Sequence, residues 1–356
     1  MIADVADLGV GLIGYGLAGK VFHAPFVAAT PGLSLRAVVS RDAAKVHADW
    51  PGVTVAPDVA GLLALPGIDL VIVASPDHCH AGDARAALAA GRHVLVDKPF
   101  ATSLDEARAV AAAADAVGRM LTVFHNRRWD ADFLTLRALV EDGRFGDIVH
   151  FESHFDRWRP EPPAVWKEAR EAGSWQDLGP HLVDQALCLF GRPQAVTADI
   201  ATMRAGAPGP DWFHVILHYD GMRAILHSSK LAADHGLRFA VHGTGGSWIK
   251  HGLDPQEAAI VAGMAVDDAA MGIDDRPGAF TPADPHATPQ ATAGRRGDYA
   301  RFWRELAAAL RGQGDNPVTA AEGLAVMEVL ETALLSARQR RTIDLPPAAR
   351  PSRPRR

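Results

Sequence analysis

The sequence predicts an α/β protein with two domains, a parallel-sheet domain followed by an α+β domain. Three observations support this prediction. The chain has 356 residues, residues 10–123 alternate short β-branched runs with Ala-rich amphipathic stretches, and the pattern changes after residue 124. The length suits two domains, each with its own core. The alternation is typical of βαβ units, and helices followed by several strands are typical of an α+β domain.

The first domain is expected to span residues 1–123. Its apolar runs predict strands at 10–13, 35–39, 70–74, 93–96 and 121–124. Helices are predicted at 83–90 and 104–117, because glycines suited to the left-handed C-cap, Gly91 and Gly118, follow them. Together these elements predict a parallel sheet whose strands are connected by helices.

The second domain is expected to span residues 124–345. Strand-like runs at 148–155, 195–203, 213–219, 222–228 and 238–242 predict a large, mostly antiparallel open sheet, with a hairpin turn at 219–222. Residues 254–297 form a long excursion that is expected to be mobile or to cover a site. Helices are predicted at 298–311 and 320–339, and residues 346–356 are expected to be disordered.

The composition excludes several kinds of partner. Apolar residues make up 48%, charged residues 22%, and the net charge is -6, which gives no positive field for nucleic acid or an anionic membrane. The N-terminus has no basic region and no apolar run approaches the roughly 18 residues of a membrane span, so we expect a cytoplasmic protein. Cys79 and Cys188 lie far apart without metal-ligand spacing, so we predict neither a disulfide framework nor a metal site.

A glycine-rich turn at residues 14–19 follows the first strand and opens a helix. In this context the G-x-G-x-x-G pattern predicts an N-terminal Rossmann dinucleotide-binding domain. The first glycine permits the tight turn, the second lets the backbone approach a pyrophosphate, and the third allows close helix–strand packing. The pyrophosphate is expected at the helix N-terminus. The predicted cofactor contacts of this turn are Gly14, Tyr15, Gly16, Leu17, Ala18 and Gly19.

The end of the second strand distinguishes NAD from NADP, because an acid there binds the ribose 2′-OH and a cation accommodates a 2′-phosphate. Ser40 stands where the acid is expected, and Arg41 follows it. Ser40, Arg41 and Lys45 therefore favour NADP through a hydroxyl contact and charge-assisted contacts. The alternative is that Arg41 is a solvated surface residue and that Asp42 supplies the carboxylate for NAD.

Further motifs extend over nearly the whole chain. They are Ala-Ser-Pro-Asp-His-Cys-His at 74–80, Asp-Lys-Pro at 97–99, Phe-His-Asn-Arg-Arg-Trp at 124–129, Gly-Ser-Trp-Gln-Asp-Leu-Gly-Pro-His at 173–181 and Pro-Val-Thr at 317–319. In this order, and with the glycine-rich turn, they resemble the Gfo/Idh/MocA family, named after glucose-fructose oxidoreductase and inositol dehydrogenase. Segment 16–25 is similar to members that act on scyllo-inositol with NADP.

The resemblance implies further contacts beside the cofactor. These are Ser75, Pro76, His80, Asp97, Lys98 and Pro99. Two positions depart from the family pattern, which usually has Glu at position 97 and Asn at position 77. The shorter Asp97 changes the reach of the carboxylate near the nicotinamide, and Asp77 adds a negative charge there.

Oxidation of a secondary alcohol requires hydride transfer, a positioned base and a group that stabilises the developing alkoxide. Lys98 ends a parallel strand at its carboxyl side, where ligands bind in open α/β sheets. His181 is the candidate base, because an imidazole accepts a proton near neutral pH. If a helix opens after residues 179–180, Asp177 and His181 converge on one pocket, which matches the family's Asp-x-x-x-His pattern. The predicted catalytic residues are therefore Lys98, Asp177 and His181.

A polyol substrate needs several hydrogen-bonding groups with defined directions. Such groups occur at the start of the second domain and along its first strand. Asp156 and Arg157 point to opposite faces of a regular strand, so at most one of them is expected to face the pocket. The predicted substrate contacts are Asn126, Arg127, Trp129, Asp156, Asp177 and His181.

Together these features predict an oxidoreductase that transfers a hydride between NADP, less favourably NAD, and a ring hydroxyl or ketone of an inositol-like polyol or sugar. Two alternatives stay open. One is the same fold acting on another substrate, such as a deoxysugar, a trans-dihydrodiol or a biliverdin-like compound. The other is a non-catalytic dinucleotide-binding sensor, which needs neither Lys98 nor His181. The resemblance also implies a sheet face of the kind often buried between subunits, so we expect a homodimer or homotetramer.

Overall fold

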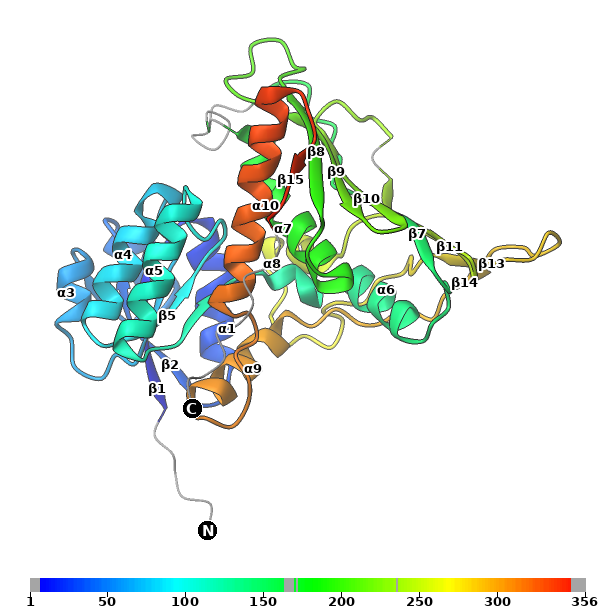
Figure 1. Cartoon of the computed structure of the whole chain (residues 1–356). Helices are drawn as coiled ribbons and strands as arrows, with labels where there is room; N and C mark the ends of the chain where they lie inside the picture. The colour runs from blue at the N-terminus through cyan, green and yellow to red at the C-terminus, as the bar shows by residue number, and fades with distance from the viewer. Residues whose placement is uncertain (1–6, 163–169, 171, 235, 347–356) are drawn as a thin grey trace, which may run out of the picture. The chain divides into compact units, whose positions relative to one another are not determined.

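The computed structural model describes residues 7–162, 170, 172–234 and 236–346. The chain forms two compact units (Figure 1). Unit 1 comprises residues 1–138, 253–277 and 293–328, and unit 2 comprises residues 139–252, 278–292 and 329–356. Each unit thus combines segments that are distant in sequence. The domain limits predicted at 123 and 345 stay predictions, and residues 347–356 of the expected tail lie outside the described residues.

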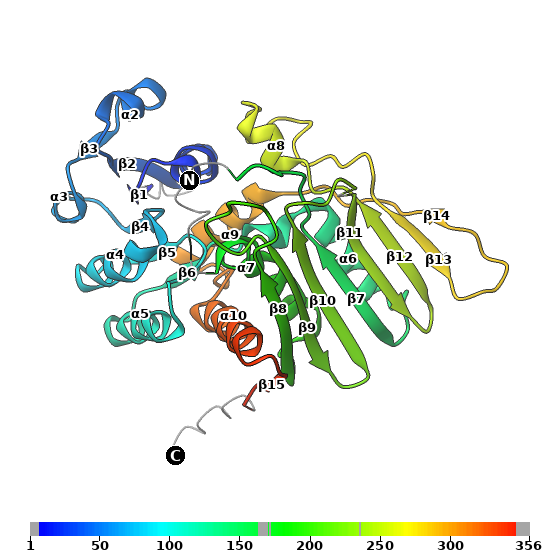
Figure 2. The same ribbon diagram turned by 90° about the horizontal axis from the view of Figure 1, so that it is seen from above.

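Unit 1 contains a six-stranded sheet in the order β3-β2-β1-β4-β5-β6, in which every neighbouring pair is parallel (Figure 2). The order reverses between β1 and β4, the point at which open α/β sheets bind their ligands. This arrangement confirms the predicted Rossmann domain. The strands are β1 (Leu8–Ile13), β2 (Leu33–Val39), β3 (Thr54–Ala56), β4 (Leu70–Val73), β5 (His93–Val96) and β6 (Leu121–Val123).

The helices of unit 1 follow the strands as βαβ crossovers require. The prediction for 104–117 is confirmed at both ends, because Ser103 accepts from Glu106 N at the start and Gly118 adopts the left-handed conformation at the end. The helix predicted at 83–90 begins earlier, at Asp77. The helices are η1 (Ala18–His23), α1 (Ala24–Ala29), α2 (Ala43–Asp49), α3 (Val59–Leu63), α4 (Asp77–Ala89), α5 (Leu104–Val117), η2 (Asn126–Trp129), α8 (Gln256–Val261) and α9 (Tyr299–Leu310).

Unit 2 contains a nine-stranded sheet in the order β14-β13-β12-β11-β7-β10-β9-β8-β15. Its neighbours are antiparallel except for β7 and β10, so the predicted, mostly antiparallel sheet is confirmed. The strands are β7 (Ile148–His154), β8 (Ala195–Ala201), β9 (Trp212–Tyr219), β10 (Met222–Ser229), β11 (Leu237–Gly243), β12 (Gly246–His251), β13 (Ala279–Pro282), β14 (Gln290–Ala291) and β15 (Ile343–Asp344). Helix α7 (Gly173–Phe190) belongs to this unit, and α6 (Ala131–Glu141) and α10 (Ala320–Gln339) contribute residues to both units.

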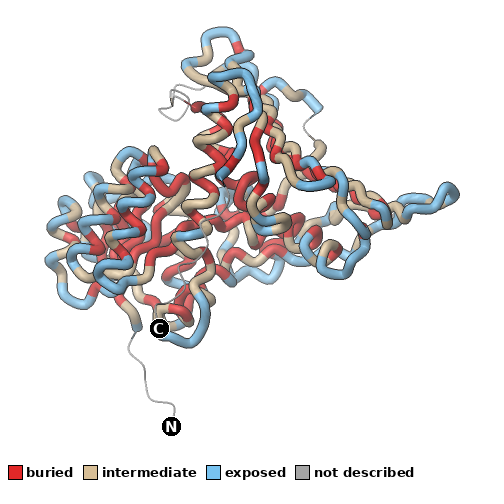
Figure 3. The backbone as a smooth tube through the Cα atoms, in the orientation of Figure 1, coloured by how far each residue is buried: buried red, intermediate tan, exposed pale blue. Residues whose placement is uncertain are grey.

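The two faces of the central strands of unit 2 differ in burial (Figure 3). Along β7, β9 and β10, buried residues alternate with half-buried or exposed ones, as expected for a sheet covered on one face. Helix α7 packs against β9 and β10, and the ring of its Trp175 meets that of Phe213 on the buried face. The other face carries polar side chains that include His154, His214 and His227. Among the helices that the structure describes, none combines the length and the apolar character needed to cross a bilayer.

Candidate active site

The glycine-rich turn lies at the carboxyl end of β1, beside the loop that follows β4. Gly14 has a φ of 98°, and a Cβ on it would lie 2.5 Å from the carbonyl oxygen of Ala74. A Cβ on Gly19 would lie 2.1 Å from the carbonyl oxygen of Gly14, whereas a Cβ on Gly16 would meet no atom within 4 Å. Packing inside the unit therefore requires the first and third glycines. The open space beside Gly16 fits the close approach of a dinucleotide pyrophosphate.

Hydrogen bonds and an ion pair connect the glycine-rich turn and the helix after it to α2. The Tyr15 hydroxyl donates to Asp49 Oδ2 at 2.8 Å, and Lys20 Nζ lies 2.7 Å from the same oxygen. Burial, together with the bond to Asp49, raises the pKa of Tyr15 well above its usual value. Lys45 Nζ donates to the carbonyl oxygen of Tyr15 at 3.0 Å, which joins the start of α2 to the turn.

The residues at the end of β2 divide between a helix cap and the surface. Asp42 is the N-cap of α2, and its Oδ1 accepts from Lys45 N at 3.0 Å. Ser40 Oγ accepts from Asp42 N at 3.1 Å. Arg41 is exposed beside them. The Asp42 carboxylate, which would bind the ribose of NAD, is therefore bonded to the start of its own helix. Arg41, which would bind the 2′-phosphate of NADP, is exposed.

The loop after β4 is bonded to the loop after β5. Ser75 Oγ donates to Asp83 Oδ2 at 2.7 Å. The buried His80 lies between the two loops, with Nε2 2.9 Å from the carbonyl oxygen of Ser75 and Nδ1 2.8 Å from that of Pro99. Pro76 is the exposed N-cap residue of α4. The structure thus brings the predicted residues of both loops together at the carboxyl edge of the sheet.

Asp97 is fixed immediately before Lys98. Its Oδ1 accepts from Lys98 N at 2.8 Å, and its Oδ2 lies 3.7 Å from Nε2 of His23. The second contact is electrostatic, because 3.7 Å exceeds hydrogen-bond length. The His23 ring is fully buried, with ring centroids 4.5 Å from Phe124 and 5.7 Å from Trp303. Burial alone would raise the pKa of Asp97, but His23 and Lys98 outweigh it and lower the pKa to about 2.

No role for His23 is predicted from the sequence. Its signal was a histidine among apolar residues in the helix that follows the glycine-rich turn. Its contact with Asp97 joins segments far apart in the chain, so local pattern does not reveal it. His23 therefore enters the candidate site as a neighbour of Asp97.

Asp177 and His181 lie one turn apart on α7 and thus on the same face of that helix. The predicted start of this helix after residues 179–180 is wrong, because α7 begins at Gly173 and Pro180 lies inside it. The error arose because proline usually occupies the first turn of a helix. Asp177 Oδ1 accepts from Arg170 Nη1 at 3.4 Å, and His181 is buried.

The residues predicted to contact substrate at 126–129 are buried within unit 1. Arg127 pairs with Asp130 and Glu257, and the ring of Trp129 meets that of Phe302 with centroids 5.4 Å apart. These contacts engage the Arg127 guanidinium. The substrate-binding roles of Asn126, Arg127 and Trp129 stay predictions.

Asp156 follows β7 on the polar side of the sheet in unit 2. Its Oδ1 accepts from Ser229 N at 2.7 Å, and its Oδ2 lies 3.2 Å from Nδ1 of His154. Burial lowers the pKa of His154, but its contacts with Asp156 and Glu152 outweigh burial and raise it. Asp156 is thus already part of a polar cluster.

Comparison with known proteins gives matches along almost the whole chain. Residues 8–125 match the model of the oxidoreductase family, NAD-binding Rossmann fold, and residues 137–345 match that of the oxidoreductase family, C-terminal alpha/beta domain. The uncharacterized oxidoreductase YdgJ of Escherichia coli is 46% identical over 95% of this chain and 99% of its own length. The scyllo-inositol 2-dehydrogenase (NADP(+)) IolW of Bacillus subtilis is 36% identical over 96% of this chain and 97% of its own.

Solved structures of oxidoreductases also match this chain over nearly its whole length. The YPO2259 oxidoreductase structure from Yersinia pestis has a TM-score of 0.93 at 45% identity, covering 97% of this chain and 99% of that one. Both family models describe oxidoreductases, and the N-terminal model describes an NAD-binding fold. The chain is therefore an NAD(P)-dependent oxidoreductase and belongs to the Gfo/Idh/MocA family.

Proposed function

We propose that the chain reversibly oxidises a ring hydroxyl of an inositol-like polyol or sugar to a ketone, with NADP as the hydride acceptor. The observation that carries the choice of cofactor is the capping bond from Lys45 N to Asp42 Oδ1, because it engages the carboxylate that NAD would need while Arg41 is exposed. Similarity to the NADP-dependent scyllo-inositol 2-dehydrogenase IolW supports the substrate class.

The proposed chemistry divides among three side chains. When bound, the nicotinamide supplies the hydride acceptor and donor. Lys98 donates a hydrogen bond to the reacting oxygen of the substrate and stabilises the developing alkoxide. His181 removes the hydroxyl proton during oxidation and returns it during reduction. Asp177 binds a neighbouring substrate hydroxyl or orients the imidazole.

Substitution of Lys98 and of His181 tests the mechanism. We expect Lys98→Ala and His181→Ala each to lower kcat with an inosose and NADPH by about 10²- to 10⁴-fold, the usual contribution of general acid–base catalysis. NADPH binding, measured by fluorescence titration, should be largely retained. The exposed His251 provides a matched control, and His251→Ala should leave turnover unchanged. Full turnover in both test variants would contradict the mechanism and favour a dinucleotide sensor.

Substitution at the end of β2 tests the choice of cofactor. Arg41→Ala removes a charge-assisted contact with the 2′-phosphate, so we expect kcat/KM for NADPH to fall roughly 10- to 100-fold with no change for NADH. Arg108 is an exposed arginine on α5, and Arg108→Ala should change neither value. An equal loss with both cofactors would contradict the assignment to NADP.

Transfer of label tests the substrate class directly. Deuterated NADPH should transfer its label to at least one ketone in a panel of inososes and sugar ketones. Binding of NADPH without transfer to any of these ketones would remove the proposed substrate class.

A further inference from the structure

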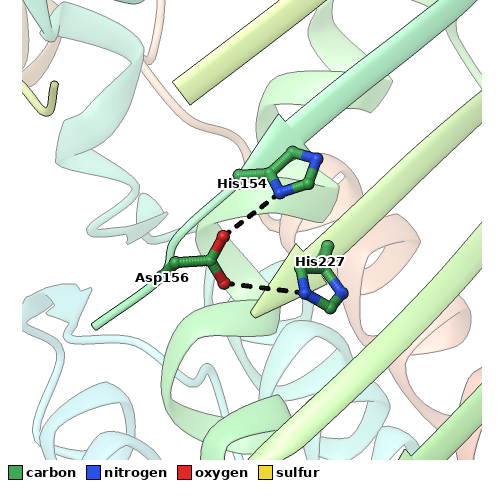
Figure 4. A group of neighbouring side chains, drawn as sticks. All are labelled: His154, Asp156 and His227. Carbon is green, nitrogen blue, oxygen red and sulfur yellow. Dashed lines mark hydrogen bonds and ion pairs between the residues drawn. The ribbon is translucent and has the colours of Figure 1, made fainter. Parts of the chain in front are cut away.

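Two neighbouring strands of unit 2 bring two imidazoles and a carboxylate together on the polar face of the sheet (Figure 4). His154 on β7 is the register partner of His227 on β10, and Asp156 lies two residues after His154, which places it on the same face. One ligand atom from each of these three residues lies within 4.8 Å of those of the other two. The rings of the two histidines lie with centroids 5.1 Å apart.

The distances within this cluster fit a metal centre. His154 Nδ1 lies 3.2 Å from Asp156 Oδ2, and His227 Nε2 lies 3.7 Å from Asp156 Oδ1. A tetrahedral ion with ligands at 2.0–2.2 Å places its ligand atoms about 3.3–3.6 Å apart. The contact with His227 exceeds hydrogen-bond length and lies just above this spacing, and the contact with His154 lies just below it. The two contacts are made to different oxygens of Asp156, and one donor atom of each residue lies within 4.8 Å of those of the other two, so a closing movement of these side chains brings three donors around one ion.

The surroundings of His154 point in the same direction. Carboxylates flank both of its ring nitrogens, since Glu152 Oε2 lies 2.7 Å from Nε2 and Asp156 Oδ2 lies 3.2 Å from Nδ1. Two carboxylates favour a positive charge at the ring, which either a proton on Nδ1 or a metal ion between Nδ1 and Asp156 supplies. With a metal ion on Nδ1, the neutral ring donates Nε2–H to Glu152. Metal-bound histidines commonly donate their second N–H to a carboxylate in this way, which fixes the tautomer.

Charge balance and chemical type identify the class of ion. Glu152 and Asp156 bring two negative charges to the cluster, which one divalent cation neutralises. Imidazole nitrogen suits zinc-like transition metals, whereas magnesium and calcium prefer oxygen ligands. Trp212 borders the cluster, with its ring centroid 5.5 Å from that of His227, and supplies an apolar edge.

We propose that His154, Asp156 and His227 bind one divalent transition-metal ion of the zinc class, with Glu152 orienting His154. Three protein ligands leave a coordination position for water or for a hydroxyl of a bound molecule. Cysteine spacing in the sequence indicates no metal site, whereas the pairing of β7 with β10 brings His227 to residues far earlier in the chain.

Metal titration tests the proposal. The full chain, without a histidine tag, is treated with a chelator, dialysed and titrated with Zn²⁺ by calorimetry and with Co²⁺ by visible absorption. We expect one saturable site per chain and the ligand-field bands of nitrogen- and oxygen-bound Co²⁺. His154→Gln and His227→Gln should weaken binding by at least about 100-fold, and Glu152→Gln by about 10-fold, as for loss of a metal ligand and of its carboxylate partner.

A histidine of the same sheet serves as the matched control. His218 lies on β9, where its Nε2 is 2.8 Å from Thr197 Oγ1, outside the cluster. His218→Gln should retain the affinity of the parent chain. Circular dichroism checks that each variant is folded, and Asp156→Asn provides a third ligand substitution if either histidine variant is not.

Two outcomes would overturn the proposal. One is the absence of saturable binding to the parent chain, in which case a protonated His154 between two carboxylates accounts for the geometry. The other is retention of full affinity in the folded His154 and His227 variants. None of these measurements uses a substrate or NADP, so their failure is distinguishable from failure of the proposed oxidoreductase function.

Discussion

Asp97 is a carboxylate held inside unit 1, directly before the proposed catalytic lysine. Its backbone bond from Lys98 and its proximity to His23 favour the ionised form, and its folded pKa is about 2. An aspartate in an unfolded chain titrates near 3.9. Because the folded pKa is the lower one, the carboxylate stabilises the fold at pH values above about 4. This contribution is lost as the pH falls through about 2.

We therefore expect Asp97→Asn to lower the free energy of unfolding at pH 7 by about 2 kcal/mol, the value of a shift of this size. The deficit relative to the parent chain should shrink as the pH falls from 4 towards 2. Urea unfolding followed by fluorescence across this range measures both values. Asp105, whose carboxylate is almost fully exposed on α5, is the control, and Asp105→Asn should show no such pH dependence. A deficit that does not change with pH would contradict the assigned cause.

The sequence predicts where the residues of short motifs lie in the fold. It does not predict which residues from distant segments contact them. The glycine-rich turn and Asp97 follow strands directly, so their place at the carboxyl edge of the sheet follows from local pattern. The partners Asp49, Asp83 and His23 come from helices whose packing the sequence does not display. Side-chain bonds between such segments depend on tertiary structure, which single-sequence patterns do not specify.

At the scale of elements, α7 depends on a close contact between its own residues. A Cβ on Gly179 would lie 2.7 Å from Cε3 of Trp175. The Trp175 ring is almost fully buried against Phe213, and its Nε1 donates to the carbonyl oxygen of Leu330 at 3.1 Å, so it has little freedom to move. Gly179 is therefore required for packing although it lies inside a helix.

We expect Gly179→Ala to destabilise the chain by roughly 1–3 kcal/mol, the usual cost of overpacking. Alanine has the higher helix propensity, so the sign of the change separates packing from propensity. Thermal or urea unfolding measures it. Gly82 is the matched control, because it lies in α4 and a Cβ there would meet nothing within 4 Å. Gly82→Ala should stabilise the chain by about 0.5–1 kcal/mol, and the same sign at both positions would contradict the packing argument.

The elements that were predicted are those with long apolar or periodic runs. The strands β1, β4 and β5 are almost continuously buried runs, β2 is a mostly apolar run that is buried in part, and α5 has a cap at each end. The missed strand β3 has three residues, and β14 has two, which are too short to show a pattern. Strand β13 lies within the predicted excursion at 254–297, where Pro and Gly masked it.

At the scale of the whole molecule, two helices contribute residues to both compact units. Helix α10 spans Ala320–Gln339, and the division between the units falls after residue 328. Helix α6 is divided in the same way after residue 138. Each part of α10 is shorter than about 12–15 residues, the length below which an isolated helix is marginal in water. We therefore expect each part to remain helical only while the unit that it packs in stays folded.

We therefore expect the two units to unfold together in one thermal transition. Differential scanning calorimetry should give a calorimetric enthalpy equal to the van't Hoff enthalpy. NADPH should raise the temperature of the whole transition, because binding to one unit stabilises everything that unfolds with it. Two resolved transitions, with only one shifted by NADPH, would contradict this expectation.

The single parallel pair in the sheet of unit 2 has a consequence for the order of folding. Strands β7 and β10 are neighbours in space, but α7, β8 and β9 lie between them in the chain. During synthesis, His154 therefore emerges from the ribosome long before His227. Contacts between distant residues form slowly because a long loop must close first. We expect the histidine cluster to be assembled late, after the β9–β10 hairpin has formed.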